Sequence, residues 1–202
     1  MTTKLEAEKR SLVLPVERRE SDDGQATVSG YAAIFGETTD IGGFFKEVIA
    51  RGAFTKTLQT ADVRAYFDHD RGRILGRTSA GTLRLVEDAK GLAVEIDLPD
   101  TSDGRDVRTL IERGDITGMS FGFVVLRQEW DETGDIPTRT IFEVELREVS
   151  IVSEPAYDGT TIALRSLDEA RKERRQHNFN AAAHRIGMKV SLDLQLRARS
   201  KA

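Results

Sequence analysis

Short runs of alternating apolar residues, separated by turns that contain Gly or Asp, occupy residues 11–164 of the chain. In the clearest run every second residue is apolar: Leu92, Val94, Ile96 and Leu98. This period of two is typical of strands with one buried face, because successive side chains of a strand point to opposite sides of a sheet. The pattern favours a β-rich fold, and parallel βαβ repeats are not visible in it.

The alternation predicts strands within residues 12–16, 26–37, 62–70, 82–88, 91–99, 119–126 and 141–152. The turn at 88–91 is a plausible hairpin connection between two of them. Many short strands with few helices are typical of barrels and sandwiches. We therefore predict a β-rich α+β fold, with a closed or half-closed antiparallel β-barrel and a few surface helices.

Two short helices are expected between the strands, at residues 52–58 and 102–115. The second has the stronger signals, because Ser102 or Asp103 can cap its start and Gly114 can end it.

Charge divides the chain into two parts. Residues 165–202 hold ten Lys and Arg against four acids, a balance of +6 that leaves −10 on residues 1–164. Little apolar surface follows the short run at 162–164, too little to fold alone. We expect a folded domain over 1–165 and a basic C-terminal tail over 166–202, helical or mobile. The tail either contacts a partner or is merely solvated, and the acidic body argues against specific nucleic-acid binding.

Composition excludes several classes of protein and site. With 202 residues, 39% hydrophobic and 32% charged, the chain is long enough for one domain with a tail. It has no cysteine, hence no disulfide, thiol nucleophile or cysteine-ligated zinc. No window resembles a membrane span, and the apolar run Leu12–Leu14 is too brief for a secretory signal. We expect a cytoplasmic protein without membrane contact.

His69 is the one histidine of the expected folded domain, since His177 and His184 lie in the tail. It is expected at the end of its strand, on the face that carries the apolar residues, and it is flanked by Asp68 and Asp70. A histidine so placed is either a structural residue or a catalyst. A zinc site is a poor third interpretation, because such sites usually need three or four suitable ligands.

Ser120 lies in the most informative segment, ITGMSFGF (116–123). Met119 and Phe121 take one face of the expected strand and Ser120 takes the other. Glycines at 118 and 122 leave room for a substrate backbone near the hydroxyl. The letters match G-x-S-x-G, but the apolar run that follows indicates a strand and not the helix of an α/β-hydrolase. The alternative is a strand serine beside a bulge.

Glu148 stands where the alternation of Phe142, Val144 and Leu146 predicts an apolar residue. A buried carboxylate needs a partner, and a histidine is a suitable one. Alternatively the strand has already bent, and the pattern alone does not choose. A serine, a histidine and a carboxylate form a coherent set for acyl transfer, in which the serine attacks, the histidine moves the proton and the carboxylate orients the imidazole.

Several segments, in this order, resemble the tailed-phage prohead maturation proteases of the HK97 type, distant relatives of the herpesvirus assembly proteases. They are GYAAIFG (30–36), IARGAF (49–54), AYFDHD (65–70), ILGRT (74–78), LRLVEDAKGLAVEIDLPDT (83–101), RGDITGMSFGF (113–123) and LREVSIVSEPAYDGT (146–160). The resemblance does not reach 166–202. It implies a herpesvirus-protease-like fold, with His69 and Ser120 as the catalytic pair. Glu148 is the implied third residue, and Glu154, which departs from the family's usual apolar residue, is its rival.

The resemblance implies a serine endopeptidase that acts inside the procapsid, in the host cytoplasm, and needs no cofactor or metal. Its implied partners are the major capsid protein with its scaffolding segment, and its own tail through self-cleavage, with a homo-oligomer left open. The alternative from another class is a non-enzymatic assembly protein, a β-barrel that docks on capsid subunits. A metal-dependent hydrolase comes third.

Overall fold

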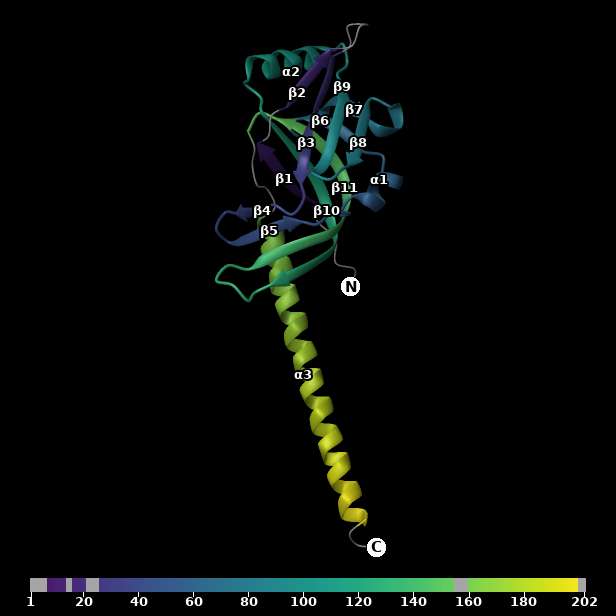
Figure 1. Cartoon of the computed structure of the whole chain (residues 1–202), viewed down its shortest axis with the longest axis vertical. Helices are drawn as coiled ribbons and strands as arrows, with labels where there is room; N and C mark the ends of the chain where they lie inside the picture. The colour runs from purple at the N-terminus through teal and green to yellow at the C-terminus, as the bar shows by residue number, and fades with distance from the viewer. Residues whose placement is uncertain (1–6, 14–15, 21–25, 155–159, 200–202) are drawn as a thin grey trace. The chain divides into compact units, whose positions relative to one another are not determined.

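The computed structural model describes residues 7–13, 16–20, 26–154 and 160–199. It divides the chain into two compact units, Met1–Ile162 and Ala163–Ala202. The first unit holds all the described strands in two sheets, with two short α-helices, α1 (Thr55–Thr60) and α2 (Ser102–Arg113) (Figure 1). The predicted β-rich α+β class is confirmed.

The larger sheet has the strand order β1-β10-β11-β5-β4, with β6 paired to β11 and β7 paired to β6. Its strands are β1 (Glu8–Val13), β4 (Thr38–Ile41), β5 (Phe45–Ile49), β6 (Arg64–Phe67), β7 (Asp70–Arg77), β10 (Gly118–Asp131) and β11 (Thr138–Val152). Strand β11 has two parallel neighbours: its residues 138–141 pair with β5, and its residues 148–151 pair with β6. The long strand β11 therefore lies between β6 and β10, the strand that carries Ser120.

The smaller sheet has the order β2-β3-β9-β8, all antiparallel. Its strands are β2 (Glu17–Glu20), β3 (Ala26–Ile34), β8 (Leu83–Glu87) and β9 (Gly91–Asp97). The expected hairpin at 88–91 is present, because Asp88 accepts hydrogen bonds from the backbone N–H groups of Lys90 and Gly91 at 2.7 and 2.9 Å. No described ladder joins the two sheets, so the described strands do not form one closed barrel.

The core lies where apolar side chains of both sheets form one buried cluster. Val28 and Val94 contribute from the smaller sheet, and Phe121 and Ile151 from the larger. The ring of Phe121 packs edge-on against Phe54 with centroids 5.5 Å apart. The predicted core face of β10 is thereby confirmed, and Ser120 lies on its opposite face.

Two local expectations need correction. The predicted strand at 62–70 is β6 followed by a turn at 68–69 and the first residue of β7. Of the strand predicted at 12–16, residues 12–13 belong to β1, and residues 14–15 lie outside the described residues. Helix α2 is capped by Thr101, whose hydroxyl accepts a 3.3 Å hydrogen bond from Gly104, and not by Ser102 or Asp103. Gly114 ends α2 as predicted, with φ of 79°.

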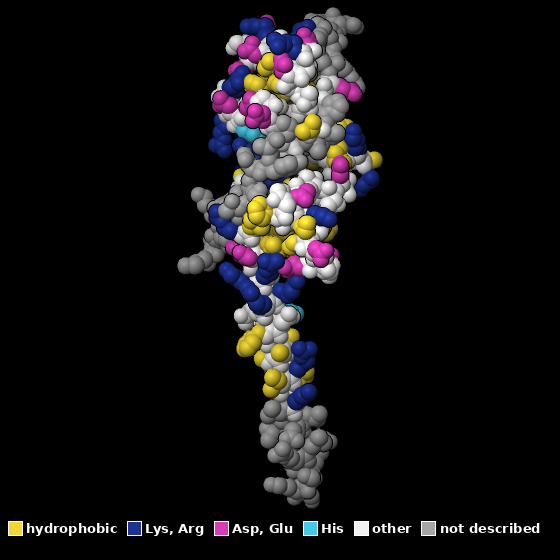
Figure 2. Space-filling view, turned by 90° about the vertical axis from the view of Figure 1, so that its left-hand side faces the viewer, with side chains coloured by type: hydrophobic (Ala, Val, Ile, Leu, Met, Phe, Trp, Pro, Cys, Tyr) yellow, Lys and Arg dark blue, Asp and Glu magenta, His cyan; other side chains and the backbone are white. Residues whose placement is uncertain are grey.

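The second unit consists of most of helix α3 (Thr160–Arg199), 40 residues long. Its described part carries many Lys and Arg, together with apolar side chains that are more than half exposed, namely Phe179, Ile186 and Met188 (Figure 2). Within the described residues no helix is both long and apolar enough to cross a bilayer.

Candidate active site

Four hydroxyl side chains form a row across four neighbouring strands. Ser11 of β1 pairs with Ser120 of β10, Ser120 with Ser150 of β11, and Ser150 with Tyr66 of β6. Residues paired across strands point to the same side of a sheet, so the row lies opposite the core face. All four residues are buried, and Ser120 is completely inaccessible to solvent.

The next row holds the carboxylate. Gly122 of β10 pairs with Glu148 of β11, and Glu148 pairs with Arg64 of β6. Glu148 is 8% exposed, and its Oε1 contacts Nδ1 of His69. An Nδ1–H that donates to this carboxylate leaves Nε2 as the acceptor nitrogen of the ring.

The bend considered for β11 is present. The β10–β11 register shifts between Gly122 and Phe123, so that Phe123 pairs with Leu146 and Arg147 is passed over. Because of this bulge, the buried apolar parity changes along β11 from Leu146 to Val149. Glu148 is thereby placed on the side of Ser120, and it also has the histidine partner that burial requires.

His69 lies in a turn. The prediction that it lies at the end of a strand, on the apolar face, is therefore wrong. Phe67 pairs with Asp70, and the two residues between them have positive φ, 49° at Asp68 and 59° at His69. Two such residues are typical of a type I′ hairpin turn, although Gly usually occupies one of them. The left-handed backbone at His69 costs roughly 1–3 kcal/mol, and such strain is typical of functional sites.

Asp68 and Asp70 stabilise this turn. The carboxylate of Asp68 accepts hydrogen bonds from the backbone N–H of Ser153 at 2.7 Å and from its hydroxyl at 3.0 Å, and the Asp68 N–H donates to the carbonyl of Ile151 at 2.9 Å. The Asp70 carboxylate accepts from the N–H of Gly72 at 2.8 Å. Both aspartates thus serve the hairpin, and the described residues contain no cluster of three or more acidic or histidine ligands.

The absent side chain at Gly122 makes room for Glu148. A Cβ built on Gly122 would lie 2.7 Å from Cγ of Glu148 and 3.1 Å from its Oε1. The sequence pattern predicted that this glycine leaves room for a substrate backbone. The structure gives a different reason for a glycine at this position: any larger residue would displace the Glu148 carboxylate that contacts His69.

Replacing Gly122 with alanine should therefore displace the Glu148 carboxylate from His69 while the protein still folds. If this pair serves catalysis, as the resemblance implies, activity should fall by at least about tenfold, because a small misplacement of a catalytic group is costly. Activity and thermal unfolding measured on the same preparation check this. As a matched control, Gly134→Ala should retain activity, since a Cβ there has no neighbour nearer than 3.7 Å. Equal activity of the two variants would contradict the assignment.

Strand β1 covers the serine. The hydroxyl of Ser120 donates a 2.8 Å hydrogen bond to the carbonyl of Arg10, and no hydrogen bond between Ser120 and His69 occurs in this structure. Because β10 lies between β1 and β11, its backbone N–H groups point to these neighbours. The N–H groups of 120–122, which are candidate oxyanion donors, are therefore engaged in the sheet. The turn at 155–160 offers other candidate donors, but its residues 155–159 lie outside the described residues.

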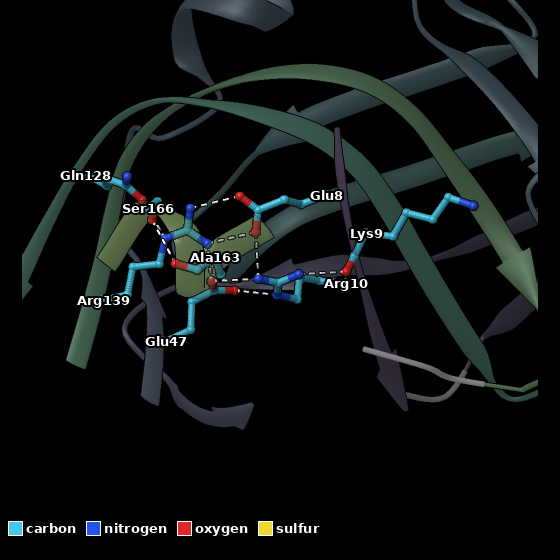
Figure 3. Close-up of polar contacts among 8 residues, drawn as sticks. All are labelled: Glu8, Lys9, Arg10, Glu47, Gln128, Arg139, Ala163 and Ser166. Carbon is cyan, nitrogen blue, oxygen red and sulfur yellow. Dashed lines mark hydrogen bonds and ion pairs between the residues drawn. The ribbon is translucent and has the colours of Figure 1, made fainter. Parts of the chain in front are cut away.

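Four buried charged side chains hold β1 against the rest of the sheet (Figure 3). Arg10 donates to Glu47 at 2.7 and 2.9 Å and to Glu8 at 2.8 Å. Arg139 donates to both carboxylate oxygens of Glu8, at 2.7 and 2.8 Å, and to Glu47 at 3.0 Å. These four residues, the charge quartet, come from β1, β5 and β11, and each is at most 4% exposed.

The charge quartet is electrically balanced, with two cations against two anions. Burial opposes the charge of Arg10, yet Glu47 and Glu8 together raise the pKa of its guanidinium above the usual value. The charge quartet was not predicted from the sequence. Its only local signal is the alternation of Glu8 and Arg10, which places opposite charges on one face of a strand.

Glu154, the rival for the acidic role, follows the end of β11 and is exposed. Glu148 is the carboxylate that the structure brings to His69. A groove of about 490 Å³ reaches Glu148 and is also lined by Arg64, Tyr66 and Arg71. Space for a ligand is thus present beside the carboxylate.

Comparison with known proteins identifies the family. Residues 14–173 match the family described as caudovirus prohead serine proteases. This chain belongs to that family. The resemblance therefore extends past residue 165, where the sequence pattern was expected to end it. The prohead protease of Enterobacteria phage HK97 is 32% identical over 188 residues, which cover 90% of this chain and 78% of the relative.

Among solved structures, the capsid assembly protease of bacteriophage T4 is similar to this prohead protease in fold. The TM-score is 0.52 at 11% identity, and the match covers 74% of this chain and 98% of the other. The predicted family, and with it the predicted general function of a phage prohead protease, are therefore confirmed.

Proposed function

We propose that this prohead protease is a serine endopeptidase in which Ser120 is the nucleophile, His69 the general base and acid, and Glu148 the orienting carboxylate. The observation that carries the proposal is the contact of Glu148 with His69 Nδ1, two residue pairs along β10 and β11 from Ser120. The mechanism needs no cofactor.

The proposed reaction begins when the Ser120 hydroxyl turns from the Arg10 carbonyl toward His69. The Ser120 oxygen then attacks the substrate carbonyl carbon while Nε2 of His69 takes the hydroxyl proton. His69 delivers this proton to the leaving amine, and a water molecule later releases the acyl group from Ser120 by the same path. Glu148 stabilises the imidazolium and keeps Nδ1 protonated, so that Nε2 faces the reaction.

We propose that the substrates are the scaffolding segment of the major capsid protein and the basic tail of the protease itself. The HK97 relative is named for the prohead, which supports a site of action inside the procapsid, in the host cytoplasm. The groove beside Glu148 supports entry of an extended peptide from that side. We further propose that the two sheets are the half-closed form of the predicted herpesvirus-protease-like barrel. Residues 1–165 then form the catalytic part and 166–202 the removable tail, and a homo-oligomer is compatible with this arrangement.

Replacing Glu148 with glutamine should lower activity by about 10²- to 10⁴-fold, because the amide keeps the shape but cannot stabilise the imidazolium. Glu154→Gln is the matched control and should keep near-native activity, since Glu154 is exposed beyond the end of β11. Cleavage rates of the two variants on one substrate check this. The reverse ranking would move the acidic role to Glu154.

A serine-reactive fluorophosphonate tests the whole proposal. The protease should be labelled at Ser120, whereas a non-enzymatic assembly protein should not be labelled. Co-expression with the cognate capsid protein, followed by mass spectrometry, should show cleavage products of that protein and loss of residues beyond about 166 in the protease. Absence of both label and products would favour the assembly protein, and loss of activity with a chelator would favour a metal-dependent hydrolase.

A further inference from the structure

Ser150 carries a buried hydroxyl that the proposed mechanism does not use. The residue is 1% exposed, and its Oγ has no hydrogen-bond partner in this structure. Burying a hydroxyl without a hydrogen-bond partner destabilises the folded state, so such groups are rare in folded proteins. Alanine would fill this position without that cost. The presence of an unpaired hydroxyl at this buried position therefore indicates a functional role for Ser150.

Ser150 lies directly opposite the proposed nucleophile. It pairs with Ser120 across the β10–β11 ladder, and the two side chains lie on the same face. Cβ atoms of such pairs are about 4.5–5.5 Å apart, and rotation about one bond in each serine brings the two hydroxyl oxygens within hydrogen-bonding distance. In this structure Ser120 donates to Arg10 on the other side, which leaves Ser150 alone.

We propose that Ser150 donates a hydrogen bond to the Ser120 oxygen when Ser120 leaves the Arg10 carbonyl and reacts. This inference rests on the proposed function. The Ser120 proton goes to His69, the new bond forms between the Ser120 oxygen and the substrate carbonyl carbon, and the carbonyl electron pair moves to its oxygen. Ser150 keeps its own proton throughout. Its hydrogen bond stabilises the negative charge that develops on the Ser120 oxygen, both in attack and when that oxygen departs from the acyl-enzyme.

The test uses the full chain and the rate at which a fluorophosphonate labels Ser120. Ser150→Ala should be labelled about tenfold more slowly, which corresponds to one hydrogen bond that is made in the transition state. The same variant should unfold at an equal or higher temperature than the parent protein, because an unpaired buried hydroxyl has been removed. Ser150→Thr keeps the hydroxyl and should recover labelling. Ser29→Ala, on β3 of the smaller sheet, is the control and should label normally.

Each readout separates this role from a structural one. The pH midpoint of labelling should not move in Ser150→Ala, because His69 and Glu148 are unaltered. An unchanged labelling rate, a lower unfolding temperature, or a shifted midpoint would each overturn the proposal. Failure of the parent protein to label at all would instead refute the proposed function, so the two failures are distinguishable.

Discussion

Replacing Ser120 or His69 with alanine should abolish cleavage of the capsid protein, with a loss of roughly 10⁶-fold in kcat. Ser120→Ala removes the proposed nucleophilic oxygen, and His69→Ala removes the group proposed to accept its proton. Because these groups act as one unit, the double variant should be no slower than either single variant. Single-turnover cleavage rates of the three proteins check this.

Thermal unfolding of the same variants supplies the control. Ser120→Ala loses one hydrogen bond, to the Arg10 carbonyl, and should remain folded. His69→Ala alters a turn whose other hydrogen bonds come from Asp68 and Asp70, so the β6–β7 hairpin should persist. If either folded variant cleaves at a near-native rate, or if the losses multiply in the double variant, the assignment of the pair is wrong.

Replacing Arg139 with methionine should lower the free energy of unfolding by about 3–5 kcal/mol, since it breaks a buried ion pair and leaves its partners uncompensated. Arg139 is 1% exposed and makes three of the ion-pairing hydrogen bonds of the charge quartet. Without it, Glu8 and Glu47 have only Arg10 to balance two negative charges. Denaturant unfolding, monitored by circular dichroism, gives the change directly.

A double variant distinguishes charge imbalance from simple loss of packing. Glu8→Gln together with Arg139→Met leaves a balanced pair of Arg10 and Glu47, which keep their 2.7 Å contact. The double variant should therefore be more stable than Arg139→Met alone. Arg105→Met is the surface control, because its pair with Asp100 is exposed and should contribute less than about 1 kcal/mol. If Arg139→Met is no worse than this control, the charge quartet does not hold β1.

Local sequence patterns predicted much of the fold, because strand alternation and helix ends depend on residues that are close together in the sequence. Alternation marks a strand with one buried face, and Met119 and Phe121 lie in the core as it predicted. Gly114 ends α2 because glycine tolerates the left-handed backbone found there. Strands β4 and β5 were missed. The alternation in Phe45–Ile49 becomes clear only when its pairing with β11 is known.

The candidate site was predicted in its residues but not in its geometry. Glu148 was predicted as a site residue because it is a charged residue at a position where the alternation predicts an apolar one. The bulge in β11 places its side chain on the face opposite the core. His69 was predicted to lie on a strand. The turn at Asp68-His69 could not be predicted locally, because turns of this type usually contain glycine and this one does not. The backbone there is held by Ser153, far along the chain, which no local pattern can reveal.

By itself the sequence determined the β-rich class, the family, and the three side chains that form a coherent set for acyl transfer. These depend on residue identity and on short-range periodicity, which are visible in one dimension. Only the tertiary structure decided that Glu148 meets His69, that Gly122 gives Glu148 its space, and that Ser150 stands unpaired opposite Ser120. Those relations depend on the register between strands and on burial, and both arise only when distant segments of the chain pair.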